Sequence, residues 1–114
     1  MEFFRKWRYK KELIKNLERE AWRGDIDAAY LRASVGELEK LLGSIKKESE
    51  ILENRAKLLT HGQERKKVQE ELEAKKKSAE IAASNISVLR KQANERGAQS
   101  AQARDFLKFV KKNF

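Results

Sequence analysis

Residues 31–59, LRASVGELEKLLGSIKKESEILENRAKLL, contain the clearest pattern in the chain. Apolar side chains recur there at alternating spacings of four and three residues, as at the a and d positions of a heptad repeat. Seven of these positions carry a large or branched side chain: Leu31, Val35, Leu38, Leu42, Ile45, Leu52 and Leu59. Ser49 and Ala56 fill the other two. The spacing predicts one long helix with a narrow apolar seam.

A second seam with the same alternation follows along residues 68–93. Its apolar members are Val68, Leu72, Ala79, Ala82, Ile86, Leu89 and Ala93. The two seams are out of phase by two residues, which a single continuous coiled coil does not accommodate. Gly62 lies between them, and glycine readily takes the left-handed conformation in which helices end. We therefore predict an antiparallel helical hairpin with its turn near Gly62.

Folding the chain about this turn aligns the two seams along their whole length. Leu52 then faces Lys75, the one charged residue at a seam position, and Ser49 faces Ala79. A lysine at such a position can extend its amine out of the seam. It could also pair with Glu48 or Glu53 of the facing helix.

The ends of the chain predict two shorter helices beside the hairpin. Gly24 is expected to close the first helix, with Asp25 capping the next, and residues 97–100 form a weak glycine-containing break. The predicted fold is an all-α, antiparallel coiled-coil hairpin whose short amphipathic terminal helices gather at its open end. As a single domain it would contain a basic amphipathic helix over 1–23, hairpin arms over 25–60 and 64–96, and a C-terminal amphipathic helix over 101–113.

The composition agrees with long helices and excludes several classes of protein. The 114 residues include no proline, which allows long unbroken helices. They also include no cysteine, which excludes a disulfide framework and a cysteine-ligated zinc site. No run of about 18 apolar residues or secretory leader is visible. Lysine and arginine total 27 against 18 acidic residues, a net charge of +9. We expect a cytoplasmic protein, with association to a membrane surface as an alternative.

All nine aromatic residues lie outside residues 31–105, and the hairpin brings the two groups to its open end. Together with nearby basic residues they define the basic-aromatic head: Phe3, Phe4, Arg5, Lys6, Trp7, Arg8, Trp22, Phe106, Phe109, Lys111 and Lys112. Two interpretations stay open. The rings could form the core of the head, with the charges around it. Alternatively, the head could bind an anionic membrane surface, nucleic acid or an acidic protein.

A second apolar stripe runs beside the seams. It consists of Tyr30, Leu41, Ile51, Leu58, Ile81 and Val88. A helix that is apolar beyond one narrow seam usually contacts more than one neighbour. The candidate neighbours are the terminal helices folding back, a second hairpin in a symmetric dimer, and another protein. Gly36 and Gly43, seven residues apart, could permit the close approach of another helix.

No pattern indicates catalysis. The chain contains no glycine-rich phosphate loop, no nucleophile elbow and no cluster of ligand residues at metal-binding spacing. His61 is the only histidine, and its position favours an exposed turn residue over a metal ligand or an acid–base group. We expect no enzymatic activity, no cofactor, no metal site and no small-molecule substrate.

Three hypotheses for function follow, in order of preference. The first is a non-catalytic assembly or adaptor protein that binds a protein partner, or itself, through helix faces. The second is a peripheral membrane protein held by the amphipathic helix over residues 1–23. The third is an accessory protein that binds nucleic acid without sequence specificity. The basic clusters at residues 65–67 and 75–77 are its candidate phosphate-binding sites, although the glutamates between them weaken this hypothesis.

Overall fold

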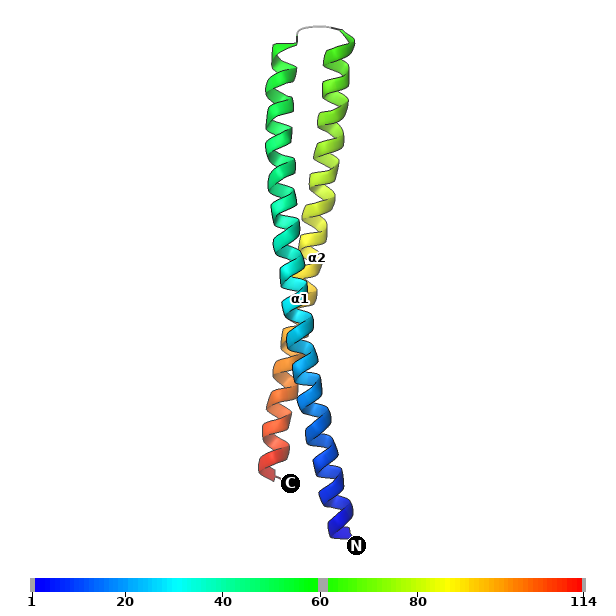
Figure 1. Cartoon of the computed structure of the whole chain (residues 1–114), viewed down its shortest axis with the longest axis vertical. Coiled ribbons are helices and arrows are strands. Elements are labelled where there is room, and N and C mark those ends of the chain that lie inside the picture. Colours follow the sequence, from blue (N-terminus) through cyan, green and yellow to red (C-terminus); the bar gives the residue numbers. More distant parts are fainter. Residues whose placement is uncertain (1, 60–61, 114) are drawn as a thin grey trace. The chain divides into compact units, whose positions relative to one another are not determined.

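The computed structural model describes residues 2–59 and 62–113, and its regular structure there consists of two helices (Figure 1). Helix α1 extends over Glu2–Leu58 and helix α2 over Gln63–Asn113. They pack against each other as an all-α helical hairpin, as predicted. Gly62 directly precedes α2 and has a φ of 105°, which only glycine adopts without strain. His61 and Phe114 lie outside the described residues.

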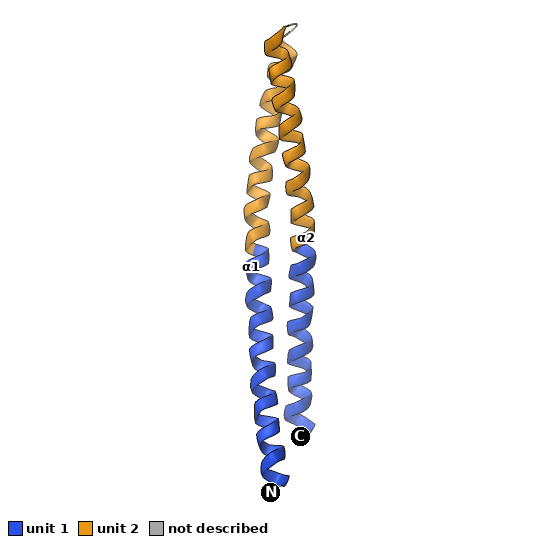
Figure 2. Ribbon diagram, turned by 90° about the vertical axis from the view of Figure 1, so that its right-hand side faces the viewer, with its two compact units in different colours: residues 1–32, 90–114 blue, residues 33–89 orange. Residues whose placement is uncertain are grey.

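The hairpin divides into two compact units (Figure 2). Unit 1 comprises residues 1–32 and 90–114, and unit 2 comprises residues 33–89. Each unit pairs a segment of α1 with an antiparallel segment of α2. Both groups of aromatic residues belong to unit 1, so the basic-aromatic head is part of this unit.

In unit 2, the predicted seam residues lie between the two helices. Six of them are buried: Val35, Ile45, Leu52, Val68, Ala82 and Ile86. The other seam positions of this unit are half-buried, Lys75 among them. Ser49 adapts to its place in the seam because its hydroxyl donates a hydrogen bond of 2.8 Å to the Ile45 carbonyl of the preceding turn.

The predicted helix ends at Gly24 and at residues 97–100 are wrong, because α1 and α2 continue through both places. The four-three alternation continues as well. It extends the first seam back through Ala28, Gly24, Ala21, Leu17, Ile14, Lys10, Trp7 and Phe3. It extends the second seam forward through Arg96, Ser100, Ala103, Leu107 and Val110. The separate terminal helices over 1–23 and 101–113 are therefore the outer parts of the same two helices.

Small residues explain why the helices need not end at these places. Ala28 is 2% exposed and Ser100 1% exposed, so both lie fully between the helices of unit 1. A Cβ atom built on Gly24 would lie 2.8 Å from the Cβ of Ser100 and 3.2 Å from the Arg96 carbonyl oxygen. Glycine is needed at position 24 for helix-to-helix contact, although it resembles a helix terminator in the sequence.

Asp25 is not the predicted helix cap but part of a polar cluster between the helices. Its carboxylate accepts a hydrogen bond of 2.7 Å from the Ser100 hydroxyl and forms an ion pair with Arg104. The same hydroxyl lies 2.8 Å from the Ala21 carbonyl oxygen, a second acceptor for its single proton. The buried serine therefore has hydrogen-bonding partners on α1, as buried hydroxyls generally require.

Three ion pairs show that the two units share one register of α1 against α2. In unit 1, Glu18 pairs with Lys111 and Asp25 with Arg104, so seven residues forward along α1 correspond to seven back along α2. Unit 2 keeps this correspondence, since Glu53 pairs with Lys76, 28 residues further on each helix. Each such exposed ion pair contributes at most about 1 kcal/mol to stability. Because the same spacing of opposite charges recurs along both helices, however, alignments in which one helix is shifted along the other would lose these pairs.

Candidate functional site

The flanks of the seam give the hairpin two distinguishable sides. With Val35 and Leu72 at heptad position a, every acidic and basic partner in the three ion pairs occupies position e of its helix. Position b neighbours position e on the helix surface. We call the surface formed by positions e and b of both helices the e side.

Positions g and c of both helices form the opposite surface, the g side. In unit 1, a groove is lined by Asp27, Gln92 and Gln99 at position g, together with Tyr30 and Glu95 at position c. Arg96 spans this groove, because its guanidinium lies 2.7 Å from the Asp27 carboxylate and also donates to Gln99. In unit 2, Glu48 at position g pairs with the seam residue Lys75 at 2.6 Å, one of the two predicted pairings.

The large exposed apolar residues in the described part of unit 2 lie on the g side. They are Leu41 at position g and Ile51, Leu58, Ile81 and Val88 at position c, and they are between 52% and 83% exposed. Tyr30 continues the stripe in unit 1, where it is also exposed. None of the large apolar residues exposed in the described part of unit 2 occupies position e or b.

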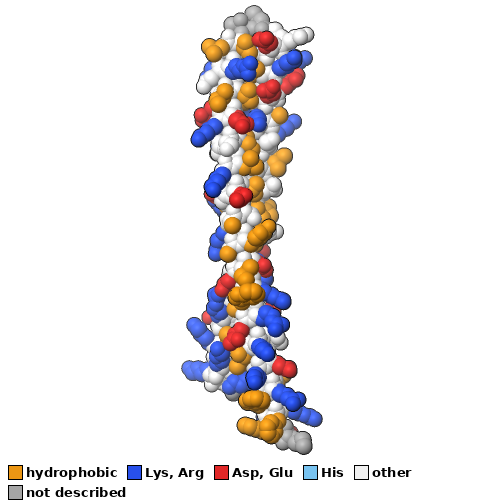
Figure 3. Space-filling view, in the orientation of Figure 1, with side chains coloured by type: hydrophobic (Ala, Val, Ile, Leu, Met, Phe, Trp, Pro, Cys, Tyr) orange, Lys and Arg blue, Asp and Glu red, His pale blue; other side chains and the backbone are white. Residues whose placement is uncertain are grey.

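The aromatic rings of the head do not form its core. The buried residues of unit 1 are small or aliphatic, and they are Leu17, Ala21, Gly24, Ala28, Ala93, Ser100, Ala103 and Val110. Phe3, Phe4, Trp7, Trp22, Phe106 and Phe109 are all exposed by about half or more. On the face seen in Figure 3, lysine and arginine side chains surround hydrophobic ones near the N-terminal end of α1. The interpretation of these rings as a core is therefore wrong for the described chain.

The first turns of α1 carry a group of exposed rings. Helix α2 ends at Asn113, two residues after Lys111, which pairs with Glu18. Consequently, the seam positions Phe3 and Trp7 have no counterpart on the described part of α2. They are 75% and 52% exposed, and Phe4 packs edge-to-face on Phe3 with ring centroids 6.1 Å apart.

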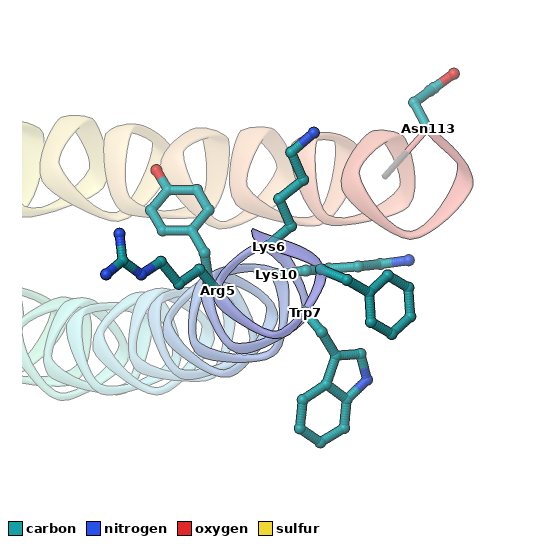
Figure 4. A pocket seen from close by; sticks show the side chains of 7 residues that line it. Arg5, Lys6, Trp7, Lys10 and Asn113 are labelled. Carbon is teal, nitrogen blue, oxygen red and sulfur yellow. The ribbon is translucent and has the colours of Figure 1, made fainter. Parts of the chain in front are cut away.

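Basic side chains surround these rings. Arg5, Lys6 and Lys10 extend from the same turns of α1 to other sides of the helix than Trp7, while Asn113 belongs to α2 (Figure 4). The Nζ atom of Lys11 lies 4.9 Å from the centre of the Trp7 ring, a cation–π contact. Arg8 and Lys11 are exposed, as are Arg5 and Lys6. We call residues 2–11 the N-terminal overhang.

At the other end of α2, the basic clusters are less suited to a polyanion than their sequence indicates. In the cluster at residues 75–77, Lys75 pairs with Glu48, and Lys76 lies 3.8 Å from Glu53. Two of its three positive charges therefore have acidic neighbours on α1, which lowers the local potential available to phosphates. Lys66 and Lys67 of the first cluster are exposed.

The glycines singled out in the sequence have different surroundings from those expected. A Cβ atom on Gly36 or Gly43 would meet no atom within 4 Å. These two glycines therefore mark no close approach between the helices described here. The close approach is at Gly24 and Ser100, which sequence reasoning missed. The continued four-three spacing through both residues is the signal that could have revealed it.

Neither helix contains an 18-residue stretch apolar enough to span a membrane, as far as the described residues show. Within residues 2–59 and 62–113, no group of three or more histidine, cysteine or acidic residues is arranged to hold a metal ion. Comparison with family models, curated proteins and solved structures finds no match to this chain. Its function must therefore be inferred from its own residues.

Proposed function

We propose that this chain is a non-catalytic helical-hairpin protein that assembles with a protein partner, or with a second copy of itself, through its g side. One observation carries the proposal: the large exposed apolar side chains of unit 2 all lie on that side. A stripe confined to one side is typical of a helix surface that another helix covers.

The chemistry of the two sides supports this assignment. Each side of unit 2 has a cross-helix ion pair, Glu53 with Lys76 on the e side and Glu48 with Lys75 on the g side. On the g side, each apolar side chain that became fully buried would contribute roughly 1.5–3 kcal/mol. Covering either side would remove water from a charged pair, and only the g side has large exposed apolar side chains whose burial offsets that cost.

Light scattering coupled to size-exclusion chromatography tests the proposal over a range of protein concentrations. The double variant Ile51→Gln/Ile81→Gln makes the g side polar and should shift the protein toward the monomer. Lys46→Gln/Ala83→Gln is the matched control, because both residues are exposed at position e of the same unit. The control should leave the oligomeric state unchanged.

A second measurement covers the case of a heterologous partner. A photo-crosslinking amino acid at position 51 should capture a neighbouring protein, and the same group at position 46 should not. The proposal fails if the chain stays monomeric at every concentration and position 51 forms no crosslink that position 46 lacks.

A further inference from the structure

We propose that the N-terminal overhang binds an anionic lipid surface, with Phe3, Phe4 and Trp7 inserting between headgroups and the surrounding basic side chains contacting phosphates. This activity is separate from association through the g side. It concerns the outer end of unit 1, whereas the apolar stripe that supports the proposed function lies mainly in unit 2.

Three of the four rings of the overhang form one arc on the helix, and the fourth, Tyr9, lies outside it at position c. Phe3 and Trp7 occupy the seam positions d and a, and Phe4 lies beside them at position e. Elsewhere in unit 1 the same seam arc is buried against α2, as at Leu17. In the first turns of α1 the same arc is exposed, since Phe3 is 75% and Trp7 52% exposed. Amphipathic helices that lie in a membrane interface present such an arc of aromatic and aliphatic residues.

The charges around this arc indicate the partner. Between residues 3 and 11 there are five basic side chains and no acidic one. A second copy of the overhang would bring a further five positive charges against them, so pairing of two overhangs is opposed by repulsion. An anionic surface is complementary instead, and each Lys or Arg near such a surface strengthens binding about fivefold.

A lipid surface fits the rings better than a nucleic acid does. Phenylalanine has no hydrogen-bonding group, and two phenyl rings lie together at the tip of the helix. A duplex offers phosphates but keeps its bases stacked, so these rings could enter it only by unstacking base steps, at about a few kcal/mol each. A bilayer interface accepts apolar rings and flanking ammonium groups simultaneously. Single-stranded nucleic acid, which could stack on the rings, is the competing ligand in the experiment.

The experiment uses the full chain with one tryptophan at a time. Trp22→Phe leaves Trp7 as the reporter in the overhang, and Trp7→Phe leaves Trp22, which is exposed on the e side of unit 1. Each protein is titrated with phosphatidylcholine vesicles and with vesicles that contain about a third phosphatidylglycerol. We expect Trp7 emission to shift to the blue with the anionic vesicles only, and Trp22 emission to change little.

Substitutions then separate the rings from the charges. Arg5→Gln/Lys6→Gln/Arg8→Gln should weaken sedimentation with anionic vesicles roughly a hundredfold, by the factor of about five for each residue. Phe3→Ala/Phe4→Ala should weaken it about tenfold or more. Two controls should bind normally: Tyr30→Ala, which removes an exposed ring, and Lys66→Gln/Lys67→Gln, which removes exposed charges elsewhere. Because the substituted overhang residues are all exposed, these variants should change Tm little.

Three results would overturn this inference. One is equal binding to neutral and anionic vesicles. Another is a Trp7 emission that stays constant while the protein sediments with vesicles. The third is a single-stranded oligonucleotide that quenches Trp7 while vesicles have no effect, which would assign the overhang to nucleic acid. None of these readouts depends on Ile51 or Ile81, so the result is independent of the proposed g-side association.

Discussion

Replacing Gly24 with alanine should destabilise the protein, although the same change usually stabilises a helix. In a helix interior, alanine is favoured over glycine by roughly 0.5–1 kcal/mol. At position 24 the added Cβ would lie 2.8 Å from the Ser100 Cβ, 3.2 Å from the Arg96 carbonyl oxygen and 3.3 Å from the Ser100 Cα. These neighbours belong to the backbone of α2 or are attached directly to it, so no flexible side chain can move aside.

The magnitude follows from the two opposing effects. Overpacking a close helix contact typically costs about 1–3 kcal/mol. After subtracting the gain in helix propensity, we expect Gly24→Ala to lower the free energy of unfolding by about 1–2 kcal/mol. Gly97→Ala is the matched control in the same unit, since its Cβ would meet only the end of the Arg32 side chain, at 3.5 Å. That control should raise stability by about 0.5–1 kcal/mol.

Thermal and urea unfolding followed by circular dichroism measure the difference. We expect the Tm values of the two variants to differ by roughly 10 °C, at about 4 °C for each kcal/mol. All proteins should be compared at one concentration, because association changes Tm. Ser100→Gly removes the nearest contacting atom, so in a double-mutant cycle it should cost less stability in the Gly24→Ala protein than in the unsubstituted one. An increase in Tm for Gly24→Ala equal to that for Gly97→Ala would refute the close approach of the helices at this point.

Three further substitutions test other parts of the hairpin by the same unfolding measurements. Ser100→Ala should cost about 1 kcal/mol, because the buried hydroxyl donates to α1, and a more stable variant would contradict this role. Gly62→Ala should lower the free energy of unfolding by about 1–2 kcal/mol because of its φ of 105°. Steric contact adds nothing, since no atom that the structure describes lies within 4 Å of the added carbon. An unchanged Tm would show that the turn can adopt another backbone conformation without cost. Lys75→Leu should raise the free energy of unfolding by about 1 kcal/mol, because burying a leucine in the seam stabilises more than the half-exposed ion pair with Glu48 does. A loss of stability would mean that this ion pair contributes more than half-exposed pairs generally do.

The central part of the hairpin follows from local spacing. Leu42 and Ile45 in one seam and Ile86 and Leu89 in the other are large apolar residues at regular intervals, and the phase change around Gly62 requires a turn. This information is contained in short stretches of chain. Aligning the two seams about the turn limited the predicted ion-pair partners of Lys75 to Glu48 and Glu53, and the structure pairs it with Glu48.

The outer part of the hairpin could not be recognised in the same way. Gly24 and Ser100 have low helix propensity and resemble terminators when read alone. They are retained within helices because two backbones approach there, and the approach depends on residues about 75 positions apart in the chain. Local propensity contains no information about such a contact.

The sequence by itself determined that the chain is helical, where it turns and which residues form the central seam, because these depend on periodicity within each helix. The tertiary structure decided what lies outside the seam. Whether Phe3 and Trp7 are core or surface depends on where α2 ends relative to α1. Whether Ile51 and Ile81 share one side depends on the register that the cross-helix ion pairs reveal. Both are relations between two helices, and the spacing within either helix does not specify them.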